Sequence, residues 1–240
     1  MIDCHTVAFV TGANRGLGAQ FVARLLARGA RKVYAASRAG TVAIADERVI
    51  PVELDVTDDA SVAHAARLAD DTTLLINNAG VNRHCAFLAP QAPEAARAEM
   101  DVNYFGTLRM ARAFAPALMQ THGAMLNVLS VLARVSFPAM GSLCASKAAG
   151  LRLTESLRAE LAPHGVRVFA AMPGAIDTDM SRDFAGPKLI PAEAADAMLD
   201  ALTGDAGEIY IGEMAKRLAQ GLTMDRATTQ AQLFSPPGDA

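Results

Sequence analysis

The sequence predicts a doubly wound α/β fold, in which helices cover both faces of one parallel sheet. Short runs rich in β-branched and apolar residues alternate along the chain with longer amphipathic runs, and this alternation is typical of strand–helix–strand units. The first short run leads directly into a glycine-rich turn and then into an alanine- and leucine-rich helical stretch. The chain has 240 residues, of which 52% are hydrophobic, so it is long enough for one buried core and short for two. We therefore predict a single domain over residues 1–234.

The individual elements follow in chain order. The β-branched runs predict strands over residues 6–10, 32–36, 49–54, 73–77, 124–130, 166–172 and 208–211. The amphipathic runs predict helices from the glycine turn to about residue 28, over 58–69, in stretches up to 119, over 142–162 and over 191–202. Pro191 suits a first helical turn, Glu193 complements the positive helix end, and Gly204 is expected to cap the C-terminal end. The tail, residues 235–240, is expected to be disordered.

Composition excludes several classes of partner. The net charge of −3 and the pI near 5.9 provide no basic surface for nucleic acid. No apolar run approaches the roughly 18 residues of a membrane span, and the N-terminus lacks the positive segment of a secretory leader. Cys4, Cys85 and Cys144 are an odd number without C-x-x-C spacing, so we expect neither disulfides nor a metal site. These features predict a soluble, cytoplasmic protein that acts on a small molecule.

The glycine turn spans Thr11 to Gly18 (TGANRGLG) and predicts a cradle for phosphate groups. Glycines at this spacing let the chain turn sharply from strand to helix. They also leave the backbone N–H groups and the positive helix end open to a pyrophosphate. The predicted cradle consists of Gly12, Asn14, Arg15, Gly16, Leu17 and Gly18.

The end of the second strand indicates which dinucleotide would bind. An enzyme for NAD presents a carboxylate there to the ribose 2′-hydroxyl, about 20 residues past the turn. This sequence has Ser37 and Arg38 instead. Arg15 and Arg38 could converge on a 2′-phosphate, whose oxygens suit the guanidinium fork. We therefore predict NADP(H) as the cofactor; the alternative is that both arginines are solvated surface charges.

Further motifs follow in order along the chain. Together with the glycine turn they resemble the motifs of the short-chain dehydrogenase/reductase family. They are the run Asn77-Asn78-Ala79-Gly80, Asn103, Ser130, Lys147 and the turn Pro173-Gly174. The resemblance covers nearly the whole chain and implies a three-layer Rossmann-type fold. It also implies further cofactor contacts: Asp55 and Val56 at the adenine, Asn78, Ala79 and Gly80 along the groove, and Pro173, Gly174, Ile176 and Thr178 toward the nicotinamide. Asp55 could instead be a simple turn residue, and Asn78 a strand cap.

The resemblance also assigns catalytic roles. In the family, a Tyr phenol exchanges a proton with the substrate oxygen. A Lys lowers the pKa of that phenol and holds the nicotinamide ribose, a Ser orients the carbonyl, and an Asn holds a chain of water molecules. Ser130, Lys147 and Asn103 match the last three, but the tyrosine position holds Leu143. A hydrocarbon neither gives nor takes a proton, and the loss of a general acid typically costs about 10²- to 10⁴-fold in rate.

Other groups could move the proton. Cys144 is adjacent but lies about 100° around the helix. His84, in the expected substrate loop, carries an imidazole that can transfer protons, and Tyr104 is more simply a packing residue. Water relayed through Asn103 and Lys147, or a substrate that needs no acid, is the preferred interpretation. An iminium or a conjugated alkene would qualify as such a substrate.

The substrate pocket is expected to be apolar and to draw on His84, Met140, Leu143, Met180 and Phe184. Residues 177–190 are expected to form a short lid. Broad apolar faces over residues 104–119 and 143–161 predict assembly into a dimer or, as in the family, a tetramer.

The predicted function is NADP(H)-dependent hydride transfer to or from a small apolar carbonyl, imine or enone, with impaired activity on ordinary ketones. Two other interpretations remain open. The chain could be a redox-silent NADP-binding protein or a non-redox cyclase or isomerase on the same fold. Alternatively, Leu143 could have been introduced deliberately to trap a complex. The sequence names neither the substrate nor the direction of the reaction.

Overall fold

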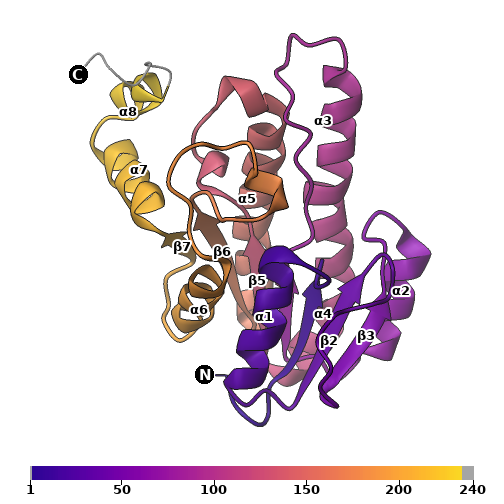
Figure 1. The fold of residues 1–240 in the computed structure, drawn as a ribbon. Coiled ribbons are helices and arrows are strands. Elements are labelled where there is room, and N and C mark those ends of the chain that lie inside the picture. The colour runs from indigo at the N-terminus through magenta and orange to yellow at the C-terminus, as the bar shows by residue number, and fades with distance from the viewer. Residues whose placement is uncertain (1, 234–240) are drawn as a thin grey trace.

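The computed structural model describes residues 2–233 and contains one seven-stranded parallel sheet (Figure 1). The strand order is β3-β2-β1-β4-β5-β6-β7. The strands are β1 (Val7–Thr11), β2 (Lys32–Ser37), β3 (Val49–Glu53), β4 (Leu74–Asn77), β5 (Ala124–Val128), β6 (Arg167–Pro173) and β7 (Glu208–Ile211). Strands β1, β4 and β5 are buried along their whole length, which explains their unbroken apolar sequence. The predicted doubly wound α/β fold is confirmed.

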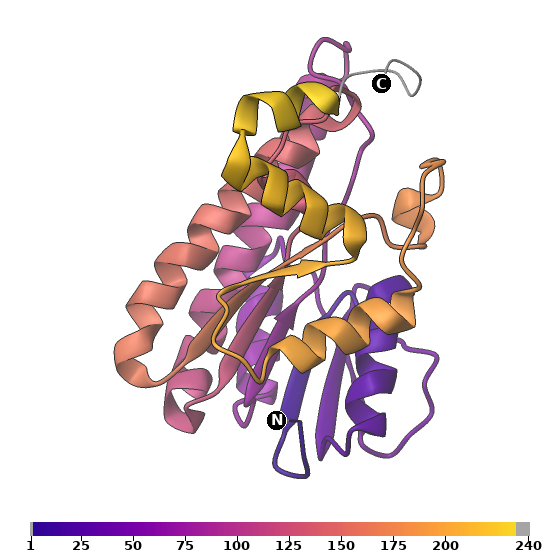
Figure 2. The same ribbon diagram turned by 90° about the vertical axis from the view of Figure 1, so that its left-hand side faces the viewer.

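Helices cover both faces of the sheet, giving three layers (Figure 2). On one face, α1 (Gly16–Ala27) and α6 (Pro191–Ala201) pack together, and side chains such as Phe21, Leu25 and Met198 form one half of the core. On the other face lie α2 (Asp59–Leu68), α4 (Thr107–Thr121) and α5 (Gly141–Leu161). Phe114 and Leu157 belong to this second half of the core.

One long helical segment runs from α3 (Ala92–Met100) through a π-helical turn (Asp101–Gly106) into α4. The backbone stays right-handed helical at both joints. The π-turn contains Asn103 and is the irregular part of an otherwise regular segment. Such turns are frequent at functional sites.

Two details of the sequence-based prediction were wrong or incomplete. Gly204 does not cap a helix: α6 ends at Ala201, its C-cap is Leu202, and Gly204 is outside the left-handed region. The chain also continues after β7 into α7 (Glu213–Met224) and α8 (Arg226–Gln232), which the prediction omitted. Pro191 and Glu193 do occupy the first turn of α6 as predicted. The predicted tail, residues 235–240, lies outside the described residues.

The winding of the chain fixes where a ligand can bind. From β1 the sheet grows through β2 to β3 in one direction, and from β4 through β5 to β7 in the other. The connections therefore diverge between β1 and β4, which leaves a crevice beyond the carboxyl ends of these strands. The glycine turn follows β1, and the run from Asn77 to Gly80 follows β4, so both lie at this crevice.

Candidate functional site

The turn between β1 and α1 requires glycine at three positions. Gly12 and Gly16 have φ values of +66° and +54°, in the left-handed region that disfavours side chains. A Cβ on Gly18 would lie 2.0 Å from the carbonyl oxygen of Gly12. The turn therefore keeps its shape only without side chains at these points. Asn14 and Arg15 are exposed on it, whereas the side chain of Leu17 is buried in the core, which leaves only its backbone for a ligand.

The run after β4 holds this turn through hydrogen bonds. The Asn78 side-chain amide donates to the carbonyl oxygens of Thr11 (2.9 Å) and Gly12 (3.3 Å). In return, the Thr11 hydroxyl accepts from the backbone N–H groups of Asn78 and Ala79, both at 2.9 Å. Asn78 thus holds the cradle in place through its side chain. The role of Thr11 was missed, although it opens the glycine motif.

Arg38, Asp55 and Thr57 lie close together beyond the ends of β2 and β3. Asp55 accepts from both the N–H (2.9 Å) and the hydroxyl (2.7 Å) of Thr57. These bonds, together with the nearby positive charges of Arg38 and Arg109, lower the pKa of Asp55 from its usual value. Arg38 is exposed beside it. Ser37 is buried and donates to the Thr41 carbonyl (3.1 Å), so no acidic side chain stands at the end of β2.

Arg15 has an ion-pair partner that the sequence did not suggest. Its guanidinium contacts the Asp179 carboxylate, and Arg182 binds the same carboxylate at 2.8 Å. These cations lower the pKa of Asp179. All three side chains are more than half exposed, so the pairs are individually weak. They connect the glycine turn to the segment that follows β6.

That segment, beginning at Pro173, reaches the turn at a second point. A Cβ on Gly16 would lie 3.3 Å from the Thr178 methyl group, so the two residues are close neighbours. Ser181 donates to the Ile176 carbonyl, and Thr178 and Ser181 form a reciprocal capping box. Gly174 lies close to Met214 at the start of α7. The structure therefore brings Thr178 to the cradle, with Ile176 two residues earlier.

Lys147 is the buried cation of the site. Its ammonium donates to the Val128 carbonyl at the end of β5 (3.0 Å), and burial lowers its pKa from 10.5 to about 8. A Cβ on Gly80 would lie 3.6 Å from Lys147 Nζ and 3.1 Å from Asn103 Oδ1. Lys147, Asn103 and Gly80, which are far apart in sequence, thus share one corner of the crevice.

Both polar atoms of the Asn103 side chain make hydrogen bonds that fix its position. Oδ1 accepts from the Val81 N–H (2.9 Å), and Nδ2 donates to the Val81 carbonyl (3.0 Å) and to Ser146 Oγ (3.0 Å). Ser146 in turn donates to the backbone carbonyl of Leu143 (2.9 Å). This connection ties the π-turn to α5. Ser146 was missed because a serine within a helix carries no sequence signal of such a contact.

Ser130 lies just after β5, and Leu143 lies in the first turn of α5. Ser130 follows β5, is partly exposed, and its Oγ accepts from the Leu132 N–H (3.2 Å), which starts the 3₁₀ helix η2 (Val131–Ala133). Leu143 lies one helical turn before Lys147 on α5 and is only 5% exposed. A buried hydrocarbon therefore stands next to the buried ammonium, on the same face of the helix.

The five predicted pocket residues are distributed over three segments. Met140 ends the 3₁₀ helix before α5, and its sulfur accepts from the Asn82 amide (3.1 Å). His84 is exposed in the same loop as Asn82, with a left-handed φ of +49°. Met180 and Phe184 lie in the segment after β6, where Met180 is 44% exposed. The amide of Asn82 connects the loop that holds His84 to Met140. The segment that holds Met180 and Phe184 contacts the glycine turn instead.

Two of the alternative proton donors are held in other interactions. Cys144 Sγ accepts from the Phe137 N–H (3.3 Å), and burial raises the pKa of its thiol. Tyr104 packs edge-on against Phe105, with ring centroids 4.9 Å apart. Both observations agree with a packing role.

A doubly wound sheet with a glycine cradle at its switch point defines a dinucleotide-binding protein. The comparisons with known proteins are more specific. The family model described as short chain dehydrogenase matches residues 6–187, so the chain belongs to the short-chain dehydrogenase family of oxidoreductases. No helix among residues 2–233 has the length and apolar character needed to cross a membrane.

Individual relatives agree with this assignment. The short chain dehydrogenase tazN of Aspergillus terreus is 36% identical over 200 residues, which is 76% of this chain but only 43% of tazN. The 1-deoxy-11-beta-hydroxypentalenate dehydrogenase of Streptomyces avermitilis is 34% identical, over 85% of this chain and 84% of its own length. A crystal structure of a short chain dehydrogenase from Burkholderia cenocepacia J2315, in complex with NADP, is 57% identical. It superposes with a TM-score of 0.94 over 98% of this chain and 100% of the other.

Proposed function

We propose that this chain is an NADP(H)-dependent oxidoreductase that transfers hydride to or from a small apolar carbonyl, imine or enone without the usual phenolic acid. The observation that carries the proposal is the corner formed by Lys147, Asn103 and Gly80. It keeps a buried ammonium and a rigid amide at the crevice where the family positions its nicotinamide. Positioning of this kind can supply about 7 to 11 kcal/mol of catalysis, and it does not depend on a phenol.

The cradle fits a phosphorylated dinucleotide. Gly12, Gly16 and Gly18 keep the turn free of side chains, so backbone N–H groups and the N-terminus of α1 are open to a pyrophosphate. Arg15 and Arg38 are exposed and would bind the 2′-phosphate, and β2 ends at Ser37, without a carboxylate. The Burkholderia relative, described as bound to NADP, supports the same choice. When bound, the cofactor would supply or accept the hydride.

Proton transfer must then avoid residue 143. We assign it to water that reaches Lys147 and Asn103, or to a substrate that develops little charge on oxygen. With a pKa of about 8, Lys147 can release and regain a proton near neutral pH, which suits the end of such a relay. Ser130 would orient the substrate, and residues 177–190 would close over it as a lid. The chain is also proposed to assemble through the faces over residues 104–119 and 143–161.

Stopped-flow measurement of NADPH oxidation with a ketone, an imine and an enone tests the proposal. The native chain is compared with Leu143→Tyr and with Leu143→Phe, which adds bulk without a hydroxyl. We expect Leu143→Tyr to raise ketone reduction by about 100-fold or more, because it restores the general acid, while Leu143→Phe gives no gain. The native chain should be most active on the imine or enone.

The absence of turnover by all three proteins, with NADPH still bound, would contradict hydride transfer. It would favour the second candidate, a redox-silent NADP-binding protein or a non-redox enzyme on the same fold. The specific observation behind that candidate is the buried hydrocarbon of Leu143 in the position where the family holds its acid.

A further inference from the structure

Among residues 2–233, Lys147 is the lysine whose ammonium has no carboxylate partner. The chain contains four lysines. The other three form ion pairs: Lys32 with Asp71 (2.7 Å), Lys188 with Asp177 (3.7 Å) and Lys216 with Glu213 (3.6 Å). A nearby carboxylate favours the charged form of an amine. The three paired lysines are therefore stabilised as cations, and Lys147 is not.

The surroundings of Lys147 favour its neutral amine. Lys147 is 8% exposed, and the hydrocarbon of Leu143 lies one helical turn before it. Burial lowers the pKa of Lys147 to about 8, and no charged side chain of the described residues contributes to this shift. At pH 8 about half of this amine is neutral, against about 0.3% for a lysine at the ordinary value of 10.5. A desolvated lysine of this kind is a nucleophile for carbonyl groups.

Gly80 leaves the amine open toward the crevice. The φ of Gly80 lies outside the left-handed region, so the backbone does not require a glycine at this point. A Cβ there would lie 3.6 Å from Lys147 Nζ and 3.1 Å from Asn103 Oδ1. Gly80 itself is half-buried. A small molecule in the crevice can therefore approach Nζ past Gly80, where a side chain would stand in its way.

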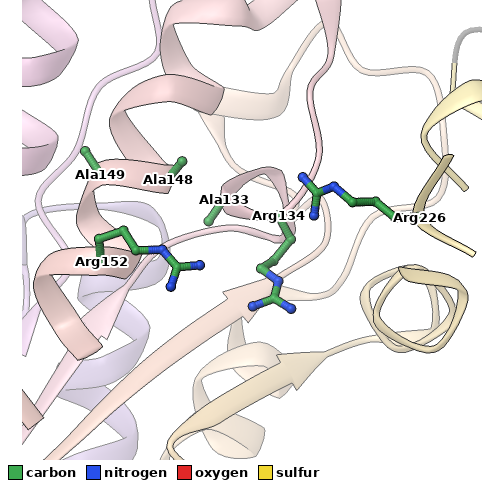
Figure 3. A pocket seen from close by; sticks show the side chains of 6 residues that line it. All are labelled: Ala133, Arg134, Ala148, Ala149, Arg152 and Arg226. Carbon is green, nitrogen blue, oxygen red and sulfur yellow. The ribbon is translucent and has the colours of Figure 1, made fainter. Parts of the chain in front are cut away.

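The Lys147 side chain points away from the outer face of α5. Ala148 and Ala149, which follow it on the helix, line a separate hollow between η2, α5 and α8 (Figure 3). Successive helical residues point in directions about 100° apart. The bond from Nζ to the Val128 carbonyl directs the lysine toward the end of β5 instead. The amine therefore belongs to the crevice side of the helix.

We propose that Lys147 forms a covalent imine with a small apolar aldehyde that enters the crevice. The neutral amine attacks the carbonyl carbon and forms a C–N bond, while the electron pair of the C=O bond moves to the oxygen. The nitrogen loses one proton and the oxygen gains one, which gives a carbinolamine. Loss of the hydroxyl group and of the remaining nitrogen-bound proton as one water molecule leaves a C=N bond. The condensation needs neither an oxidant nor a reductant.

Neighbouring groups suit this step. The bond to the Val128 carbonyl uses one hydrogen of the amine and leaves its lone pair for the attack. Ser130, two residues after Val128, accepts from the Leu132 N–H through Oγ, so its own hydroxyl hydrogen can be donated to the aldehyde oxygen. Leu143 supplies an apolar surface beside the amine. Imine formation uses only this lysine, so it is independent of the proposed hydride transfer.

Reductive trapping tests this site on the full chain without cofactor. Butanal and sodium cyanoborohydride, which reduces imines in preference to aldehydes, are added at pH 8, and peptide mass spectrometry locates the resulting secondary amines. Lys32, Lys188 and Lys216 are controls within the same sample. We expect Lys147 to be labelled at least about tenfold faster than each of them, because far more of its amine is neutral.

Two variants test the approach to the amine. Gly80→Ala places a Cβ beside Nζ and should slow the labelling of Lys147 by about fivefold or more. Gly204→Ala, whose Cβ would meet only the Ala201 carbonyl at 3.7 Å, should not change it.

Equal labelling of the four lysines, or labelling of the α-amino group alone, would overturn the imine site. An unchanged rate in Gly80→Ala would overturn the approach from the crevice. A separate titration with NADPH distinguishes the two proposals: if NADPH fails to bind, the proposed function fails, while the labelling without cofactor still decides whether Lys147 forms an imine.

Discussion

The buried ammonium of Lys147 should make the stability of the free protein rise with pH. In the unfolded chain this lysine titrates near 10.5, and in the folded chain near 8. This difference corresponds to about 3 kcal/mol, since one pKa unit is equivalent to about 1.4 kcal/mol. Between these two values the unfolded state binds more protons, so the free energy of unfolding increases with pH there. Below pH 8 both states are protonated and the whole cost of burying the charge is present.

Urea unfolding at pH 7, 8, 9 and 10, without cofactor, measures this effect. The free energy of unfolding of the native chain, relative to that of Lys147→Met, should rise by about 2 to 3 kcal/mol between pH 7 and pH 10, because all other titrating groups are common to both proteins. Lys147→Met also loses the bond to the Val128 carbonyl; the part of that bond that weakens when the ammonium becomes a neutral amine is already contained in the folded-state pKa. Lys216→Met, at an exposed lysine of α7, provides the control and should run parallel to the native chain. If the free energy of unfolding of Lys147→Met changes with pH in parallel with that of the native chain, the lowered pKa of Lys147 is refuted.

Two further predictions concern the cradle. Gly18→Ala places a Cβ 2.0 Å from the Gly12 carbonyl, so it should weaken NADPH binding more than about tenfold in a fluorescence titration, since the phosphate-binding backbone must move. Gly204→Ala, where the nearest atom is at 3.7 Å, should leave binding unchanged. Asp179→Asn releases Arg15 and should tighten NADPH binding severalfold without affecting NADH. Equal affinities for the two cofactors in the native chain would contradict the assigned role of Arg15.

The sequence predicted the layers and the succession of strands along the chain well because each strand is a short apolar run bounded by turns. It missed α8, whose residues Arg226–Gln232 include no large apolar side chain, so hydrophobic periodicity cannot detect it. The signal for α7 was present in Met214, Leu218 and Leu222, which recur at helical spacing. Gly204 was misread because a glycine after a helix suits several turn conformations besides the left-handed cap.

In the candidate site, too, the sequence predicted local motifs but not contacts between distant residues. Motifs local in sequence, such as the glycine turn and the pair Leu143 and Lys147, could be placed without the structure. Contacts that depend on tertiary packing could not, and these include Arg15 with Asp179 and Asn103 with Ser146.

The hydrogen bonds that connect Asn103 to α5 use the backbone of residue 143 and not its side chain. Ser146 donates to the Leu143 carbonyl and accepts from Asn103, and neither bond involves the Leu143 side chain. Lys147 is held by Val128 on another element. A substitution at residue 143 that keeps α5 helical therefore removes none of the hydrogen bonds that hold Asn103 and Lys147. A tyrosine at residue 143 should consequently lie one helical turn before Lys147 on the same face of α5, so the change in rate for Leu143→Tyr reports the chemistry of the hydroxyl rather than a repair of the fold.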